Sequence, residues 1–286
     1  MKQELVRMRS VDNIEMVGML YEPEEKSNRI VIHVHGLCGN FYENKFLDTL
    51  AKTYTNKGYS FLTFNNRGTN FISELIKGNG FEVIGGCYEK FKDCLLDIEG
   101  TITYAKNKEY TEIILEGHSY GCNKVLYYYD KKRDTSIKKI ILLAPCDIPQ
   151  ECVKFLSKEE YETAKQESTR LVNEGNESEL INFSVNANGV ISAGTYYNDF
   201  LPNGENDFIR YIDGENGKSE LLNNINIPVL IIFGDIDECV LTKDIEIVKK
   251  YLNNNIANCN IEIIKGADHS YTNRYEELRE ILENNL

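Results

Sequence analysis

The sequence is poor in the features that mark disordered, membrane-spanning or nucleic-acid-binding chains. It holds only five prolines and no low-complexity tract, and hydrophobic residues make up 42% of its 286 positions, so intrinsic disorder is excluded. No apolar run approaches the roughly 20 residues needed to cross a bilayer. Lysine and arginine number 32 against 45 aspartates and glutamates, a formal net charge of −13. Such a chain repels a phosphate backbone or an anionic membrane surface, so we expect no nucleic-acid and no membrane partner.

Signals for secretion are missing as well. Residues 1–7 alternate charged and apolar side chains and contain no continuous apolar segment of the kind found in a signal peptide. The eight cysteines form no C-x-x-C pair and no spacing typical of a small disulfide-rich domain. We therefore expect a cytoplasmic protein with reduced, mostly buried thiols, although the sequence alone leaves a disulfide between two of them open.

What the sequence does contain is a regular alternation of apolar strands and helices. Strands this apolar are typical of a mostly parallel sheet that is covered on both faces. The predicted strands are 29–34, 60–64, 112–115, 139–143, 229–233 and 261–264, and the predicted helices are 43–57, 88–107, 120–132, 242–254 and 272–284. An N-terminal hairpin of residues 3–9 and 14–21 adds two strands at the sheet edge. The pattern predicts an α/β fold with eight strands and helices on both faces.

One interval interrupts this alternation. Between the sixth strand, which ends near Ala144, and the next clear strand lie roughly 80 residues, too many for a structureless loop. Residues 147–227 hold 15 acidic against 6 basic residues, and 151–173 is helix-like. We predict a cap inserted at 147–227 between two parts of a core domain, 1–146 and 228–286. Its aromatic residues either form a small core of their own or line an apolar substrate site: Phe155, Tyr161, Phe183, Tyr196, Tyr197, Phe200, Phe208 and Tyr211.

A G-x-S-x-G motif provides the candidate nucleophile. Gly117-His118-Ser119-Tyr120-Gly121 follows a predicted strand directly and precedes a predicted helix, which is the context that gives this motif its meaning. The tight turn strains the serine backbone, and the glycines remove Cβ atoms where strand and helix crowd together. Ser119 is thereby presented at the carboxyl edge of the sheet, at a helix N-terminus that favours negative charge.

A serine nucleophile needs a base, and the sequence offers only four histidines. His118 neighbours Ser119 and is badly placed to turn back on it. His33 and His35 end an early strand and are expected to pack and hydrogen-bond around the following loop. His269, in the loop after the last strand, remains as the base.

The base in turn needs a carboxylate to orient it, and a carboxylate-rich turn follows the strand 229–233. Asp235, Asp237 and Glu238 all lie in this turn, so the residues alone leave several candidates. The interval of 32 residues from Asp237 to His269 holds one helix and one strand, which returns the chain to the same sheet edge. The order Ser, Asp, His along the chain is the order expected of this fold.

Two backbone amides complete the candidate machinery. Stabilising a tetrahedral oxyanion takes at least two fixed donors, and losing one costs about 3–4 kcal/mol of barrier. The Tyr120 N–H follows the nucleophile directly and supplies the first donor. The loop His35-Gly36-Leu37-Cys38-Gly39-Asn40 flanks an exposed amide with glycines, which makes the Leu37 N–H the second.

These motifs together resemble the α/β-hydrolase superfamily over nearly the whole chain apart from the insertion. The matching segments are His35–Asn40, Asn66-Arg67-Gly68, Gly117–Gly121, Gly234-x-x-Asp237-x-x-Val240 and Gly266–Ser270, and they are similar to cinnamoyl- and feruloyl-esterase-like members. The stretch from Gly117 to Tyr128, followed by Leu142–Asp147, is also similar to bacterial siderophore-esterase-like members. The resemblance implies Asp237 rather than Asp235 as the acid, and a serine hydrolase that cleaves a carboxylic ester through an acyl-enzyme.

Other functions stay open on the same residues. An amide, peptide or thioester hydrolase or an acyltransferase would use the same triad, and a hydrolase fold can also serve as a non-catalytic ligand-binding protein. We expect no cofactor and no metal, because His33 and His35 form an H-x-H pair with no third histidine free to join it. The acidic insertion disfavours anionic substrates such as acyl-CoA and favours a small or medium neutral ester. The chain could form a homodimer.

Overall fold

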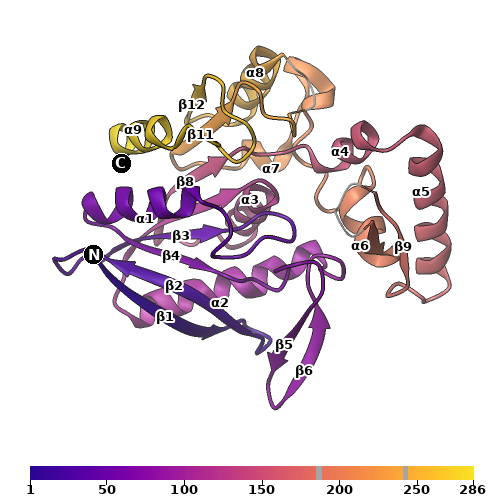
Figure 1. Cartoon of the computed structure of the whole chain (residues 1–286). Helices are drawn as coiled ribbons and strands as arrows, with labels where there is room; N and C mark the ends of the chain where they lie inside the picture. Colours follow the sequence, from indigo (N-terminus) through magenta and orange to yellow (C-terminus); the bar gives the residue numbers. More distant parts are fainter. Residues whose placement is uncertain (185–188, 241–243) are drawn as a thin grey trace.

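An eight-stranded sheet forms the centre of the molecule (Figure 1). The computed structural model describes residues 1–184, 189–240 and 244–286, and within these ranges the strand order is β1-β2-β4-β3-β7-β8-β11-β12. The β1–β2 and β2–β4 pairs are antiparallel and all others are parallel. The strands are β1 Lys2–Arg9, β2 Glu15–Glu22, β3 Arg29–Val34, β4 Ser60–Phe64, β7 Glu112–His118, β8 Ile137–Leu143, β11 Val229–Gly234 and β12 Cys259–Ile264. The predicted α/β-hydrolase fold is confirmed.

Helices cover both faces of the sheet, as strands buried on both sides require. Leu50 of α1 and Leu278 of α9 share a core with Val31 and Ile232 on one face. The other face is covered by α2, α3 and α8. The helices are α1 Phe46–Asn56, α2 Cys94–Asn107, α3 Tyr120–Lys132, α8 Ile245–Asn255 and α9 Tyr275–Asn285. None of the helices in the described ranges is long and apolar enough to cross a bilayer.

Residues 147–227, called the insert below, follow β8, the sixth strand of the sheet. The helix-like stretch 151–173 divides into two helices, because Ser157 starts a new helix with a reciprocal capping box to Glu160. The elements are α4 Ile148–Phe155, α5 Lys158–Asn173, β9 Leu180–Asn182, β10 Val190–Ser192, α6 Ala193–Thr195 and α7 Glu220–Asn223, with short helical turns at Tyr196–Phe200 and Tyr211–Asn216. In Figure 1 most of the insert lies beyond one end of the sheet.

The aromatic side chains of the insert mostly form a core. Five of the eight predicted aromatics are buried and join the core beneath α2 and α3: Phe183, Tyr196, Phe200, Phe208 and Tyr211. Phe155 and Tyr197 remain exposed. Most of them are therefore packing residues, as one alternative predicted, but they do not form a separate core, because the insert and the sheet share one hydrophobic core.

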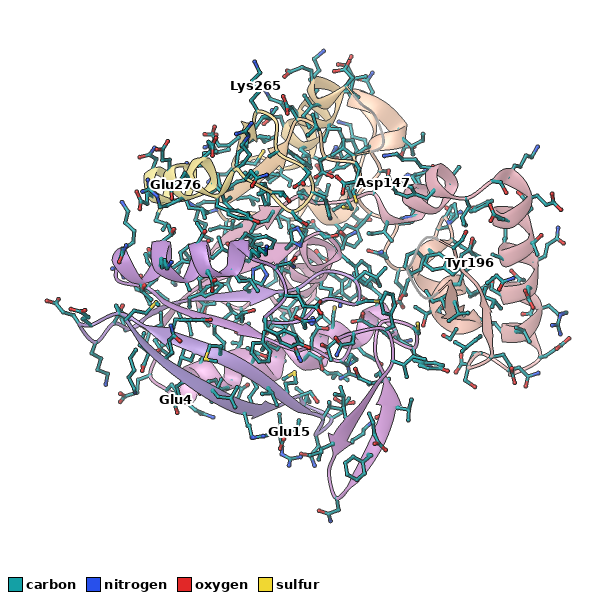
Figure 2. The ribbon with its side chains drawn as sticks, viewed as in Figure 1. Glu4, Glu15, Asp147, Tyr196, Lys265 and Glu276 are labelled. Carbon is teal, nitrogen blue, oxygen red and sulfur yellow. The ribbon has the colours of Figure 1, made fainter. Side chains whose placement is uncertain are left out.

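Asp147 marks the point where the insert leaves the sheet (Figure 2). Its carboxylate is fully buried and accepts a hydrogen bond from the Ile212 N–H at 3.3 Å. Burial raises the pKa of Asp147 to about 7, which the backbone hydrogen bonds only partly offset. This side chain ties the first residue of the insert to a turn near its end.

One hairpin, β5 Ser73–Lys77 and β6 Gly80–Ile84, was not predicted. It projects from the rest of the molecule in Figure 1 and exposes Phe81 and Val83. Because much of its apolar surface faces water, its sequence lacks the inward apolar alternation that identifies a strand.

Candidate active site

Ser119 lies in the turn that joins β7 to α3 with almost no connecting residues. Its backbone has φ 55° and ψ −127°, a strained conformation for a residue with a side chain. The Ser119 N–H donates to the Leu143 carbonyl at 2.9 Å, and the Ser119 carbonyl accepts from the Cys122 N–H at 2.9 Å. These two bonds hold the strained turn and place the hydroxyl at the carboxyl edge of the sheet.

Glycines surround this serine because the backbone segments approach too closely for a Cβ atom. A Cβ on Gly117 would lie 2.4 Å from the Gly121 carbonyl oxygen, and a Cβ on Gly121 would lie 2.1 Å from the Val34 carbonyl oxygen. A Cβ on Gly36 would lie 2.9 Å from the Ser119 Cβ. The glycines of the motif and of the loop after β3 thus allow strand, helix and loop to meet at the serine.

The two amides predicted for the oxyanion site are unpaired. Neither the Leu37 nor the Tyr120 N–H donates a hydrogen bond to another group in the part of the chain that the structure describes. Leu37 follows Gly36, where an added Cβ would lie 2.9 Å from the Ser119 Cβ, and Tyr120 is the first residue of α3. Both donors are therefore free to bind a ligand oxygen beside the serine.

Asp237 and His269 are hydrogen-bonded to each other. The His269 Nδ1 lies 3.0 and 3.1 Å from the two carboxylate oxygens of Asp237. Burial acts to lower the pKa of His269, but the hydrogen bond and charge of Asp237, together with Cys239, outweigh it and raise this pKa well above its usual value. Asp235 instead accepts a hydrogen bond from the Gly266 N–H and does not contact the imidazole.

The structure does not join the serine to the histidine. Among the described residues, Ser119 Oγ contacts Cys146 Sγ at 3.9 Å and makes no hydrogen bond to His269. Hydrogen bonds between catalytic groups are often long or misaligned in unliganded sites and tighten when substrate binds. Of the five predicted site residues, the structure thus joins Asp237 to His269 by a hydrogen bond. The Ser119 hydroxyl and the Leu37 and Tyr120 amides make no hydrogen bond to another of the five.

The remaining histidines are buried and have structural partners. His33 Nδ1 lies 2.7 Å from a carboxylate oxygen of Glu116. His35 donates from Nδ1 to the Gly36 carbonyl at 2.8 Å and accepts from the Asn66 N–H, and burial lowers the pKa of His35 to about 3. Neutral His35 therefore holds the loop that carries Leu37.

His118 contacts the backbone of His269. Its Nε2 donates to the His269 carbonyl oxygen at 2.9 Å, and burial lowers the pKa of His118 well below its usual value. The neutral imidazole of His118 thus connects the turn that holds Ser119 to the loop that holds His269. The sequence placed this residue beside the serine but gave no signal for its second contact.

Two cysteines beside the histidine were missed in the sequence. The sulfur atoms of Cys146 and Cys239 and a ring nitrogen of His269 lie within 4.8 Å of one another. Hydrogen bonding from Cys146 and His269 lowers the pKa of Cys239, although burial opposes this. Cys146 follows β8 and Cys239 follows β11, so the rule that parallel strands end at one edge could have brought them to attention.

Buried polar side chains surround Tyr120 and Lys124 on α3. The Tyr120 hydroxyl donates to Asp199 of the insert at 3.1 Å, and burial raises the pKa of Asp199 well above its usual value. Lys124, one turn along α3, forms an ion pair with Glu89 at 2.6 Å, and both side chains are almost fully buried. Tyr120, whose amide is one of the two predicted oxyanion donors, is therefore held by its side chain as well.

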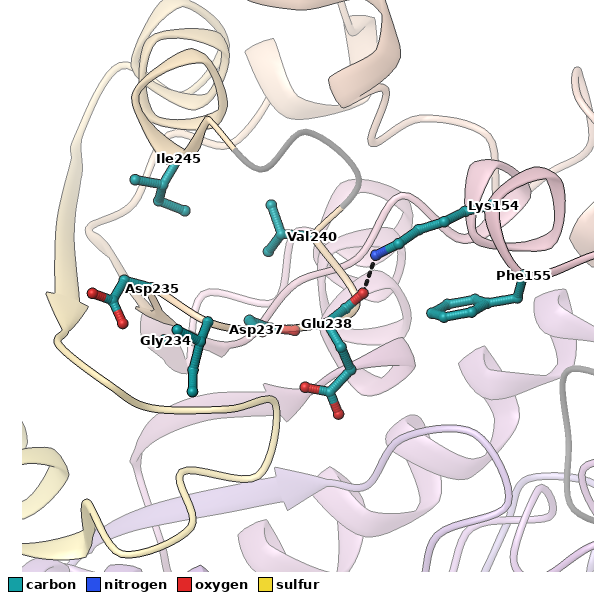
Figure 3. Close-up of a pocket in the computed structure, with 9 residues that line it drawn as sticks. Lys154, Phe155, Gly234, Asp235, Asp237, Glu238, Val240 and Ile245 are labelled. Carbon is teal, nitrogen blue, oxygen red and sulfur yellow. Dashed lines mark hydrogen bonds between the residues drawn. The ribbon is translucent and has the colours of Figure 1, made fainter.

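A cavity of about 460 Å³ lies between α4 and the turn after β11 (Figure 3). Lys154 donates to the Glu238 carbonyl across it, while Phe155 and Val240 line it with apolar surface. Asp237 contributes to its wall, but Ser119 and His269 do not. The cavity therefore flanks the turn that carries Asp237 and is not lined by Ser119.

Comparisons of the fold agree with this architecture. The structure of Est1E from Butyrivibrio proteoclasticus with bound ferulic acid is similar with a TM-score of 0.68 and 21% identity, covering 98% of this chain and 97% of that one. The Pyrococcus furiosus esterase Pf2001 is similar with a TM-score of 0.64 and 14% sequence identity, covering 99% of this chain and 90% of that one. An alpha-beta serine hydrolase homologue from Coxiella burnetii is similar with a TM-score of 0.58 and 19% sequence identity, covering 100% of this chain and 98% of that one. No curated protein matches the sequence.

The strand order, the strand directions and the strained turn at Ser119 are those of the α/β-hydrolase fold. A family model matches residues 8–285, nearly the whole chain, and its description is "Protein of unknown function (DUF1749)". The chain belongs to the DUF1749 family.

Proposed function

We propose that the protein is a serine hydrolase that cleaves carboxylic esters through an acyl-enzyme. The observation that carries the proposal is the strained Ser119, held at the N-terminus of α3 beside two unpaired amides. Backbone strain and unpaired amides cost folding free energy, and they cluster at active sites, where a G-x-S-x-G turn presents the nucleophile.

The remaining residues take complementary roles in this reaction. The neutral form of His269 removes the Ser119 proton as the hydroxyl attacks the ester carbonyl, and Asp237 holds the imidazole tautomer and stabilises the imidazolium. The amides of Leu37 and Tyr120 bind the oxyanion of the tetrahedral intermediate. His269 then protonates the leaving alcohol and activates a water that hydrolyses the acyl-enzyme.

The insert bears on the choice of substrate. We propose that residues 147–227 act as a cap over the carboxyl edge of the sheet. Their excess of acidic over basic residues, 15 against 6, disfavours anionic esters and favours neutral ones. The ferulic acid bound to Est1E makes a neutral ferulate ester a reasonable first substrate to compare with simple alkyl esters.

A fluorophosphonate probe tests the activated serine directly. Wild type should be labelled and should hydrolyse p-nitrophenyl butyrate, and Ser119→Ala should lose both. Ser27→Ala is the matched control, since this serine precedes β3 at the opposite edge of the sheet. A folded wild type that resists labelling and hydrolysis would favour the ligand-binding alternative. A lower KM for an acyl-CoA than for a neutral ester of the same acyl group would refute the substrate preference.

A further inference from the structure

Three loops bring two thiols and an imidazole together beside the serine. Cys146 follows β8, Cys239 follows β11 and His269 follows β12, and the two sulfur atoms and one ring nitrogen lie within 4.8 Å of one another. We call these three residues the thiol–imidazole cluster. Cys146 is buried, while Cys239 and His269 are partly exposed, so a small ion can reach the cluster from water.

The donor set has a defined metal preference. Two thiolates and an imidazole suit Zn²⁺ and other thiophilic divalent cations rather than Mg²⁺ or Ca²⁺. Tetrahedral Zn²⁺, with bonds of about 2.3 Å to sulfur and about 2.0–2.1 Å to nitrogen, holds its ligand atoms about 3.6–3.8 Å apart. The cluster therefore has to contract by about 1 Å at its widest separation, a distance that rotation about a cysteine χ1 bond covers.

The surroundings of the imidazole match those of a metal-binding histidine. Asp237 accepts a hydrogen bond from His269 Nδ1 at 3.0 Å, which leaves Nε2 as the nitrogen open to a further ligand. A carboxylate that orients a histidine in this way is the usual outer partner of a zinc ligand. The geometry of the Asp237–His269 pair is thus suited both to a catalytic base and to a metal ligand.

We propose that Cys146, Cys239 and His269 bind a thiophilic divalent cation, with Zn²⁺ as the principal candidate, and that the bound ion switches off the serine. The two cysteines bind as thiolates and His269 binds as the neutral imidazole, so binding releases the protons that these three groups carry to water. The ion occupies the His269 nitrogen that would accept the Ser119 proton. Ser119 Oγ, 3.9 Å from Cys146 Sγ, or a water molecule takes the fourth position. The inhibitory half of this inference rests on the proposed function, whereas the binding half does not.

Cobalt tests binding without any need for turnover. Co²⁺ added to reduced, metal-free protein should give visible bands of tetrahedral coordination and a sulfur-to-cobalt charge-transfer band, and one equivalent of Zn²⁺ should remove both. Cys146→Ser and Cys239→Ser should weaken binding by at least about 10²-fold, because even loss of an outer partner costs 10–100-fold. Cys259→Ser, a partly exposed cysteine on β12, is the matched control and should bind as wild type does.

Inhibition is then measured against each protein's own metal-free rate. Zn²⁺ should suppress p-nitrophenyl butyrate hydrolysis by wild type and Cys259→Ser at the concentration that displaces Co²⁺, and a chelator should restore it. Circular dichroism confirms that each variant is folded. The proposal is overturned by a wild type without the charge-transfer band, by equal affinity in Cys239→Ser, or by faster turnover with Zn²⁺. A protein that binds Co²⁺ but has no metal-free activity would refute the proposed function and leave the metal site standing.

Discussion

A single methyl group at Gly36 should disable the nucleophile. In Gly36→Ala the new Cβ would lie 2.9 Å from the Ser119 Cβ and 3.2 Å from the His118 carbonyl oxygen. Carbon atoms in contact stay about 3.5–4.0 Å apart, so the loop and the serine have to separate by about 0.6–1.1 Å. A misplacement of about 1 Å costs about 10²-fold in rate, or about 2.7 kcal/mol of barrier. Overpacking adds about 1–3 kcal/mol of destabilisation.

Hydrolysis of p-nitrophenyl butyrate and the rate of fluorophosphonate labelling should fall together in this variant. Most of the effect should be on kcat, since the methyl group displaces reacting atoms. Gly80→Ala is the control, because its Cβ would meet no atom closer than 3.9 Å, and it should keep full activity. Thermal unfolding monitors the stability of both variants. A folded Gly36→Ala protein with kcat within twofold of wild type would show that this contact does not position the serine.

Three further predictions concern the acid, the insert and the buried ion pair. Asp237→Asn should lower kcat by about 10⁴-fold with an intact fold, because the imidazole loses the acceptor that sets its tautomer; activity near wild type would point to another acid. The pKa of Asp147, about 7, means that the folded protein binds a proton that the unfolded chain has released, so wild type should lose stability as pH rises from about 4 to about 8. Over this pH range the free energy of unfolding of wild type, measured with urea, should fall by about 4 kcal/mol more than that of Asp147→Asn. If the two proteins showed the same dependence of stability on pH, the prediction would be wrong. Lys124→Met should destabilise the protein by about 3–5 kcal/mol in the same assay, since it leaves Glu89 buried without its partner, and Glu89→Gln in the same chain should recover part of this loss.

The architecture was predictable because its main signals are local. Apolar runs such as 229–233 indicate strands buried on both faces, and those strands lie where they were expected. The motif around Ser119 carries its own context of strand, turn and helix. The tight packing of Gly117 and Gly121 shows why no other residue fits there.

Contacts between distant loops were not predictable in the same way. The strand pattern places Cys146, Cys239 and His269 at one edge of the sheet, but it does not indicate that their side chains meet there, because that depends on how the loops pack. The hairpin 73–84 was missed since much of its apolar surface is exposed. The break at Ser157 was missed because a capping box can be masked by helix-forming residues on both sides. The predicted helix 242–254 begins in residues outside the described ranges, and α8 is described from Ile245.

Tyr120 limits how the insert can be exchanged between related proteins. Its amide directly follows Ser119 in the chain, whereas its hydroxyl donates to Asp199 within the insert. A foreign insert transferred onto this sheet to change specificity would have to bring an acceptor to the same point, since an unsatisfied buried hydroxyl costs about 1–3 kcal/mol. Chimeras that keep an acceptor at position 199 should therefore retain turnover more often than chimeras that do not. Sequence changes in the insert are thus constrained by one side chain of α3, that of Tyr120.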